Sequence, residues 1–180
     1  MGHLEDTEGI RADSPTGATE GFNLVCSFAA CRKYVLKSRD ISNAYFTADP
    51  TDRLILLGPP RGGFPGESGT RAVAMSKPVY GAKDAGRFFY KSFRRRAVAL
   101  GLIEMRLCRS LYAFYDADGA LQLLMGAPVD DIMWAANPDY EYMVTGLLQH
   151  FPLNGEIKDT QLRFCGREYA QSDDYSVYVT

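Results

Sequence analysis

Residues 121–136 read LQLLMGAPVDDIMWAA, two apolar runs separated by a proline and a pair of aspartates. Aspartate and proline are depleted in strands, so the pattern predicts a hairpin whose turn lies at residues 128–131. A second hairpin is predicted directly before it, with strands over 111–115 and 120–125 around a tight turn that contains Asp118 and a glycine. Two consecutive hairpins indicate an antiparallel sheet.

Helical patterns lie on both sides of these hairpins in the sequence. Dense apolar residues predict a mostly buried helix over 22–36, and spaced phenylalanines predict another over 83–102. A third helix is expected after Asn137-Pro138, a helix cap followed by a first-turn proline. Residues 40–46 predict a strand end that runs into a turn or short helix, and residues 161–180 predict two short strands. This mixed order predicts an α+β fold, an antiparallel sheet with helices packed on one face.

The composition is that of a single globular domain. The chain has 180 residues, of which 46% are hydrophobic and 23% charged, and this excludes a wholly disordered, collagenous or membrane-spanning protein. The net charge of −2 excludes a uniformly basic nucleic-acid coat, although a local basic face remains open. Four cysteines without a C-x-x-C pair and two histidines offer no zinc site and no dense disulfide framework. Without a signal-peptide run, we expect reduced thiols and an intracellular location, cytoplasmic or nuclear.

The two ends of the expected domain differ in character. Residues 1–20 contain five acids, one arginine or lysine and no aromatic residue, which predicts a disordered leader before a folded domain over 21–180. The glycine- and proline-rich residues 58–66 predict a loop. A P-loop would need Gly-Lys-Ser/Thr at its end, whereas here Gly69 precedes Thr70-Arg71, so a surface connection is favoured.

A basic segment and an acidic pair each leave two interpretations open. Residues 83–109 contain eight bases and two acids, a local charge of +6 that indicates either a solvated helix face or a phosphate-contacting surface. Asp130-Asp131 is either a polar hairpin turn or part of a metal site, because hard divalent cations prefer clustered oxygen ligands. A third carboxylate from another strand would complete a two-metal site for phosphoryl transfer, but composition and spacing do not identify it.

Six short blocks in one order carry a resemblance to a known family. They are DISNAY at 40–45, PP at 59–60, VYGAKDAGRFFYK at 79–91, SLY at 110–112, VDDI at 129–132 and FCG at 164–166. Together they resemble the reverse transcriptase domain of copia-type retrotransposon polyproteins, over about residues 21–180. The resemblance implies a polymerase palm-like sheet and the activity of an RNA-directed DNA polymerase.

The resemblance also implies a role for each block. Asp40, Asp130 and Asp131 would be the palm carboxylates that hold two Mg²⁺ ions, with Mn²⁺ as a substitute, for two-metal nucleotidyl transfer. Tyr45 would pack beneath the incoming sugar and exclude a 2′-hydroxyl, although a core aromatic residue is an equal alternative on the residues alone. Lys83 and Asp84 would lie at the nucleotide. The implied nucleic-acid contacts are Arg87, Lys91, Arg94, Arg95 and Arg96.

The implied partners are an RNA or DNA template-primer, deoxynucleoside triphosphates and other parts of a retrotransposon polyprotein, with no membrane. The block at 164–166 would open the strand pair that guides the primer end. Within it, Cys165 is expected to be a small buried hydrophobe rather than a reactive thiol.

Several departures from the family pattern bear on activity. Pro128 replaces a tyrosine and suits a central strand poorly, and Asp84 replaces a glutamine, placing a carboxylate toward a triphosphate. The fingers segment is expected to be partial and the thumb absent, so this copy is interpreted as truncated and impaired. The alternative is an inactive retroelement remnant that folds partly and at most binds nucleic acid. An unrelated carboxylate-metal nuclease ranks below both, because it would have no use for Tyr45.

Overall fold

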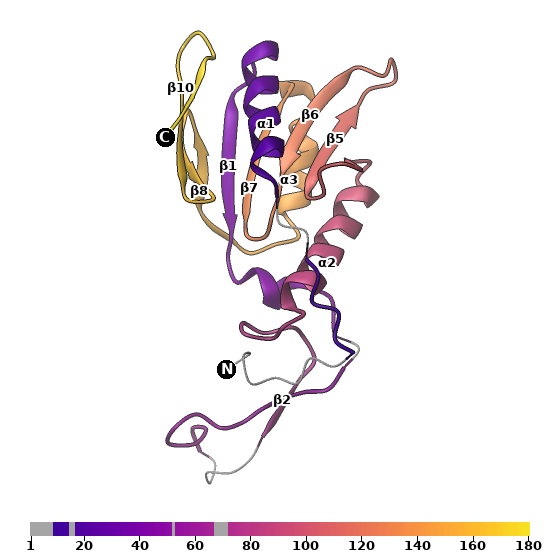
Figure 1. Ribbon diagram of the computed structural model, residues 1–180, viewed down its shortest axis with the longest axis vertical. Coiled ribbons are helices and arrows are strands. Elements are labelled where there is room, and N and C mark those ends of the chain that lie inside the picture. Colours follow the sequence, from indigo (N-terminus) through magenta and orange to yellow (C-terminus); the bar gives the residue numbers. More distant parts are fainter. Residues whose placement is uncertain (1–8, 15–16, 52, 67–71) are drawn as a thin grey trace.

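A six-stranded antiparallel sheet forms the body of the protein, with the strand order β4-β5-β6-β7-β1-β8 (Figure 1). The strands are β1 (Leu36–Ile41), β4 (Ile103–Glu104), β5 (Leu111–Tyr115), β6 (Leu121–Gly126), β7 (Asp131–Ala136) and β8 (Leu153–Asp159). Both predicted hairpins are confirmed, since β5 pairs with β6 and β6 pairs with β7. Pro128 lies in the turn between β6 and β7 rather than in a strand, so its missing N–H interrupts no ladder.

The computed structural model describes residues 9–14, 17–51, 53–66 and 72–180. Residues 1–8 of the expected leader lie outside the described residues, as do Gly69-Thr70-Arg71. The described part of residues 58–66 contains no helix or strand, which confirms the predicted surface connection. Among the described residues, no helix is long and apolar enough to cross a membrane.

Helices cover both faces of the sheet, which corrects the prediction that they pack on one face. On one face α1 (Thr19–Arg32) covers Met133 and Ala135 of β7, while α2 (Ala85–Ala99) and α3 (Tyr142–Leu148) share a second core with Trp134. Figure 1 shows α1 and α3 on opposite sides of the sheet. The fold is therefore α+β with two hydrophobic layers.

The burial pattern of β7 gives the physical reason for this arrangement of helices on both faces. Residues 132–136 are all buried, and alternate side chains enter the two different cores. A strand with only one covered face would alternate apolar and polar residues, whereas a strand buried on both faces is a continuous apolar run. The sequence IMWAA at 132–136 is such a run, so it already contained the signal for two layers.

The predicted N-terminal helix is correct in type and wrong at its end. It stops at Arg32, where Lys33 adopts a left-handed conformation with φ of 56° and donates to the carbonyls of Ala29 and Ala30. The chain then enters β1 at Leu36. At the other end Thr19 and Glu20 of the expected leader already belong to α1, while the leader's extent stays a prediction.

Two smaller sheets complete the fold. One is a two-stranded arm, β2 (Ile55–Leu57) with β3 (Val73–Met75), which extends away from the main sheet (Figure 1). The other contains β9 (Gln161–Phe164), β10 (Arg167–Gln171) and β11 (Val177–Val179), so the tail has three strands where two were predicted. The short helices are η2 (Ala44–Thr47), as expected after the first aspartate block, and η3 (Pro138–Tyr140), which Asn137 caps.

Candidate active site

The strand register brings the three predicted carboxylate residues to one edge of the main sheet, the edge formed by the strand ends where β1 finishes and β7 begins. Asp40, near the end of β1, pairs directly with Asp131 at the start of β7. The neighbouring backbone is joined as well, because the N–H of Ile41 donates to the carbonyl of Asp130 at 2.8 Å. Asp40 and the Asp130-Asp131 pair are far apart in the sequence and are held side by side by the sheet.

The surroundings of Asp131 disfavour the charged form of its carboxyl group. Burial raises its pKa above the ordinary value, and the charges of Asp130 and Asp40 raise it further. The backbone N–H of Cys165 donates to its Oδ2 at 3.3 Å and acts in the opposite direction, as does the charge of Lys158. The edge of the sheet is therefore a place where a bound cation would relieve charge repulsion.

A cleft of about 410 Å³ opens beside this edge. Asp40 and Asp131 line it, whereas Asp130 is exposed and lies outside the lining. Three basic residues share the cleft, namely Arg39, Lys158 and Arg163. The cleft therefore presents three carboxylates, those of Asp40, Asp131 and Glu156, among cationic side chains, a combination suited to a group with both a metal and phosphate oxygens.

The chemistry of the donors fits a hard divalent cation, because Asp40 and Asp131 offer carboxylate oxygens from strand ends and Asp130 offers them from the adjoining turn. Within the described residues, however, no three His, Cys, Asp or Glu side chains are grouped closely enough to hold a metal ion. The backbone register gathers the carboxylates, but their side chains do not form a finished ligand cage.

Tyr45 lies next to this edge, in the short helix η2. Its ring packs against Tyr80 with centroids 4.7 Å apart and against Phe89 at 6.5 Å. Burial raises the pKa of its phenol, with a second contribution from the charge of Asp130. The side chain is only partly buried against the core, so it combines a packed ring with a location near the carboxylates.

Asp84 has a different environment from the one the sequence predicted. Its carboxylate is buried and accepts two hydrogen bonds from the guanidinium of Arg53, at 2.6 and 2.9 Å. These bonds hold its pKa below the usual range. Asp84 is therefore not a bare carboxylate, because the guanidinium of Arg53 balances its charge within the protein, and its place at the nucleotide stays a prediction. The sequence analysis did not predict Arg53 as the partner of Asp84, because nothing in the spacing of the two residues marks the pair. Lys83, which precedes Asp84, is exposed.

The basic residues of α2 are largely paired with carboxylates of the protein itself. Arg87 binds Asp13 at 2.7 Å, and Arg94 binds Glu104 at 2.7 Å. Lys91 is exposed and its ammonium lies 5.7 Å from the ring centre of Phe88. Because Asp13 lies outside the basic segment, the local charge count along the sequence overstates the charge that α2 presents to solvent.

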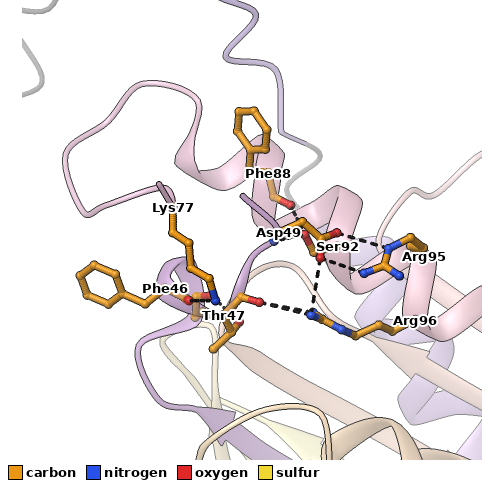
Figure 2. Close-up of polar contacts among 9 residues, drawn as sticks. Phe46, Thr47, Asp49, Lys77, Phe88, Ser92, Arg95 and Arg96 are labelled. Atoms are coloured by element: carbon orange, nitrogen blue, oxygen red, sulfur yellow. Dashed lines mark hydrogen bonds and ion pairs between the residues drawn. The ribbon is translucent and has the colours of Figure 1, made fainter. Parts of the chain in front are cut away.

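Arg95 and Arg96 form the densest part of this pairing (Figure 2). Arg95 binds the carboxylate of Asp49 at 2.8 Å, and Arg96 lies 3.7 Å from the same carboxylate. Arg96 also donates to the carbonyl of Thr47, with both contacts at 3.4 Å. Both arginines therefore contact the chain that follows Tyr45. The role of Asp49 was not predicted, since a lone aspartate before a proline reads as a turn residue.

Cys165 and Gly166 form the two-residue turn between β9 and β10. Both have positive φ, 47° and 79°, as expected for the tight turn that matches the twist of a hairpin. Cys165 is exposed, which corrects the prediction of a buried hydrophobe. Although the residue is exposed, partial desolvation of the sulfur and the charges of Asp131 and Asp130 raise the pKa of its thiol to about 11. A thiol with this pKa is mostly protonated near neutral pH, as an unreactive cysteine would be.

Comparison with known proteins assigns the chain to a class. Residues 5–172 match the family described as reverse transcriptase (RNA-dependent DNA polymerase), and the chain belongs to this family. It is similar to the retrovirus-related Pol polyprotein from transposon RE2 of Arabidopsis thaliana, with 26% identity over 138 residues. That match covers 76% of this chain and 9% of the polyprotein. No solved structure matches.

Proposed function

We propose that this chain contributes the catalytic carboxylates of an RNA-directed DNA polymerase from a copia-type element, acting by two-metal nucleotidyl transfer. The observation that carries the proposal is the register of β1 against β7, which sets Asp40 opposite Asp131 and ties Ile41 to Asp130. Membership of the reverse transcriptase family supports the reaction class.

Asp40, Asp130 and Asp131 would hold the divalent ions, Mg²⁺ with Mn²⁺ as a substitute. When bound there, the ions would supply the charge that lowers the pKa of a primer 3′-hydroxyl and stabilises the leaving pyrophosphate. The protein's own contribution is to keep these carboxylates adjacent in spite of their repulsion. The paired strands perform this task, and the Cys165 N–H stabilises the charged form of Asp131.

Tyr45 would select the sugar of the incoming nucleotide. Its ring is fixed between aromatic neighbours, and its phenol lies within the field of Asp130, beside the place proposed for the nucleotide. A rigid ring at this position would leave no room for a 2′-hydroxyl. The proposed partners are therefore a template-primer of RNA and DNA, deoxynucleoside triphosphates, and the remainder of a retrotransposon polyprotein.

Contacts with the nucleic-acid backbone are proposed for the cationic residues that line the cleft and for Lys91 of the basic segment, while Lys83 is proposed to lie at the incoming nucleotide. Arg87, Arg94, Arg95 and Arg96 would have to exchange a carboxylate of the protein for a phosphate. Their share in template binding is therefore proposed to be smaller than the local charge of +6 suggested.

The test is primer extension by the purified chain on a primed RNA template, with Mg²⁺ or Mn²⁺ and all four deoxynucleotides. Extension by the parent is expected to be weak, because this copy is interpreted as impaired, and it should disappear in Asp130→Asn. The matched control is Asp173→Asn, which removes an exposed carboxylate in the turn between β10 and β11. Equal extension by Asp130→Asn would refute the proposed carboxylate role, and a chain that binds template without any extension would favour the inactive remnant.

A further inference from the structure

A network of polar contacts joins the turn that carries Tyr45 to one face of α2 (Figure 2). The turn itself has little internal support, since η2 is a single short helix of four residues whose preceding residue, Asn43, has φ of 52°. The Oγ1 of Thr47 donates to the carbonyl of Ala44 at 2.6 Å. Short 3₁₀ segments have poor hydrogen-bond geometry, so the position of this turn depends on contacts outside it.

Ser92 supplies the most buried of these contacts. Its hydroxyl accepts a hydrogen bond from the N–H of Asp49 at 2.8 Å and donates to the carbonyl of Phe88 at 2.9 Å. The residue is 1% exposed, and losing a buried partner for a backbone N–H is costly. Ser92 thereby fixes the chain just after η2 to the backbone of α2.

Arg96 supplies a second contact that is partly buried. Its guanidinium donates to the carbonyl of Thr47, lies near the carboxylate of Asp49 and stands 5.0 Å from the ring centre of Phe151. The planar guanidinium is therefore held by a ring and a carboxylate while it holds the end of η2. Arg95 completes the group through its pair with Asp49, and from the other side Lys77 donates to the carbonyl of Phe46 at 3.2 Å.

We infer that Asp49, Ser92, Arg95 and Arg96 are positioning residues that set sugar selectivity by fixing the turn of Tyr45. This inference rests on the proposed role of Tyr45 and extends it to residues that touch no substrate. The same arginines were expected to bind phosphates, and the two roles predict opposite effects of neutralising Asp49. Removing this carboxylate would free two arginines for phosphate and strengthen nucleic-acid binding, whereas in a positioning network it loosens the turn just as removal of an arginine does.

The first experiment is amide hydrogen exchange on the full chain, which requires no activity. In Ser92→Ala and Arg96→Ala, exchange over residues 43–49 should accelerate by about five- to tenfold, the scale of one net hydrogen bond, and in Asp49→Asn by about two- to fivefold, because that carboxylate is 40% exposed. Exchange over β6 and β7 should stay unchanged. Arg106→Ala, at an exposed arginine of the same basic segment, should match the parent. Unchanged exchange over 43–49 in all three variants would overturn the inference.

The second experiment measures selectivity as the ratio of incorporation of deoxynucleotides to ribonucleotides in primer extension. The ratio should fall about fivefold or more in Asp49→Asn and in Arg96→Ala, and the charge-reversed pair Asp49→Arg with Arg95→Asp should recover part of the loss. An unchanged ratio in a parent that discriminates would overturn the inference while leaving the proposed function intact. A parent that extends neither nucleotide would refute the proposed function, and the exchange experiment would still decide the positioning role.

The third measurement is affinity for a template-primer across a salt series. The positioning role predicts that Asp49→Asn leaves affinity and salt slope within about twofold of the parent. Tighter binding by Asp49→Asn together with weaker binding and a flatter slope for Arg96→Ala would assign these arginines to phosphate contact and overturn the inference.

Discussion

The bidentate pair between Arg53 and Asp84 is expected to anchor the β2–β3 arm to the start of α2, and Arg53→Met tests this. The substitution keeps most of the apolar stem of Arg53 and removes the guanidinium that donates to both oxygens of Asp84. Asp84 is then left as a carboxylate without its two charged hydrogen bonds. Asp84 immediately precedes α2. Loss of the guanidinium that balances its charge therefore destabilises the segment where the arm meets the helix.

The size of the effect follows from burial. Hydrogen bonds to charged groups contribute about 1.5–3 kcal/mol, and breaking a fully buried pair costs about 3–5 kcal/mol. Here the Asp84 side chain is 5% exposed and that of Arg53 is 27% exposed. Because Arg53 retains contact with water, we expect a loss of about 2–3 kcal/mol of unfolding free energy, between these limits. The exposed pair of Arg95 and Asp49, by contrast, should contribute less than about 1 kcal/mol.

The assay is urea unfolding followed by the fluorescence of Trp134, the single tryptophan, which is fully buried. Amide exchange over β2 and β3 is measured beside it, so that local detachment of the arm is also detected. A loss below about 0.5 kcal/mol in both measurements would refute the reasoning, since an exposed pair gives values of that size.

The sign of the pH dependence provides a second check on the same pair. The Arg53 hydrogen bonds hold the pKa of Asp84 below its unfolded value of about 3.9, so its stabilising contribution is complete above that value. The contribution is lost as pH falls through the lower pKa of the folded state. The difference in stability between the parent and Arg53→Met should therefore be largest near neutral pH and shrink below about pH 4.

Three further outcomes are expected. Asp131→Asn should stabilise the metal-free chain against urea near neutral pH, because it removes a carboxylate whose charged form is disfavoured by burial and by two neighbours; equal or lower stability would contradict this. Phe93→Ala should cost about 3–5 kcal/mol of unfolding free energy, since the ring is 1% exposed and packs on Tyr112 and Phe151; a cost under about 1 kcal/mol would contradict it. Cys165→Asn should raise the melting temperature, because asparagine tolerates positive φ better than cysteine does; a lower melting temperature would argue against it.

The parts of the fold that the sequence predicts are those with local signals. The hairpins around residues 116–119 and 127–130 follow from turn residues between apolar runs, and α2 follows from phenylalanines at helical spacing. Asp40 and the Asp130-Asp131 turn are gathered by the sheet, as block order predicted. In each case neighbours along the chain, or blocks in a known order, already contain the information.

The remaining features depend on contacts between distant residues. β8 carries mostly exposed residues and is a strand because it pairs with β1, so its own sequence gives almost no apolar pattern. Arg53 meets Asp84, and Asp13 meets Arg87, across separations that no periodicity encodes. The charge of α2 was misjudged for the same reason, because its balancing carboxylates lie in other segments.

The location of the carboxylates within the sheet explains how the fold tolerates them. They lie at the ends of β1 and β7, which are interior strands. The two outer strands are β4, only two residues long, and β8, which is exposed and polar. Such edges resist pairing with other chains, and the most cooperative part of the structure lies between them. Mutual repulsion at Asp40, Asp130 and Asp131 therefore acts on the strands best able to resist it, because β7 is buried on both faces immediately after Asp131. The proposed site, which would have to keep like charges together, thus lies where displacement of β7 would open both hydrophobic layers.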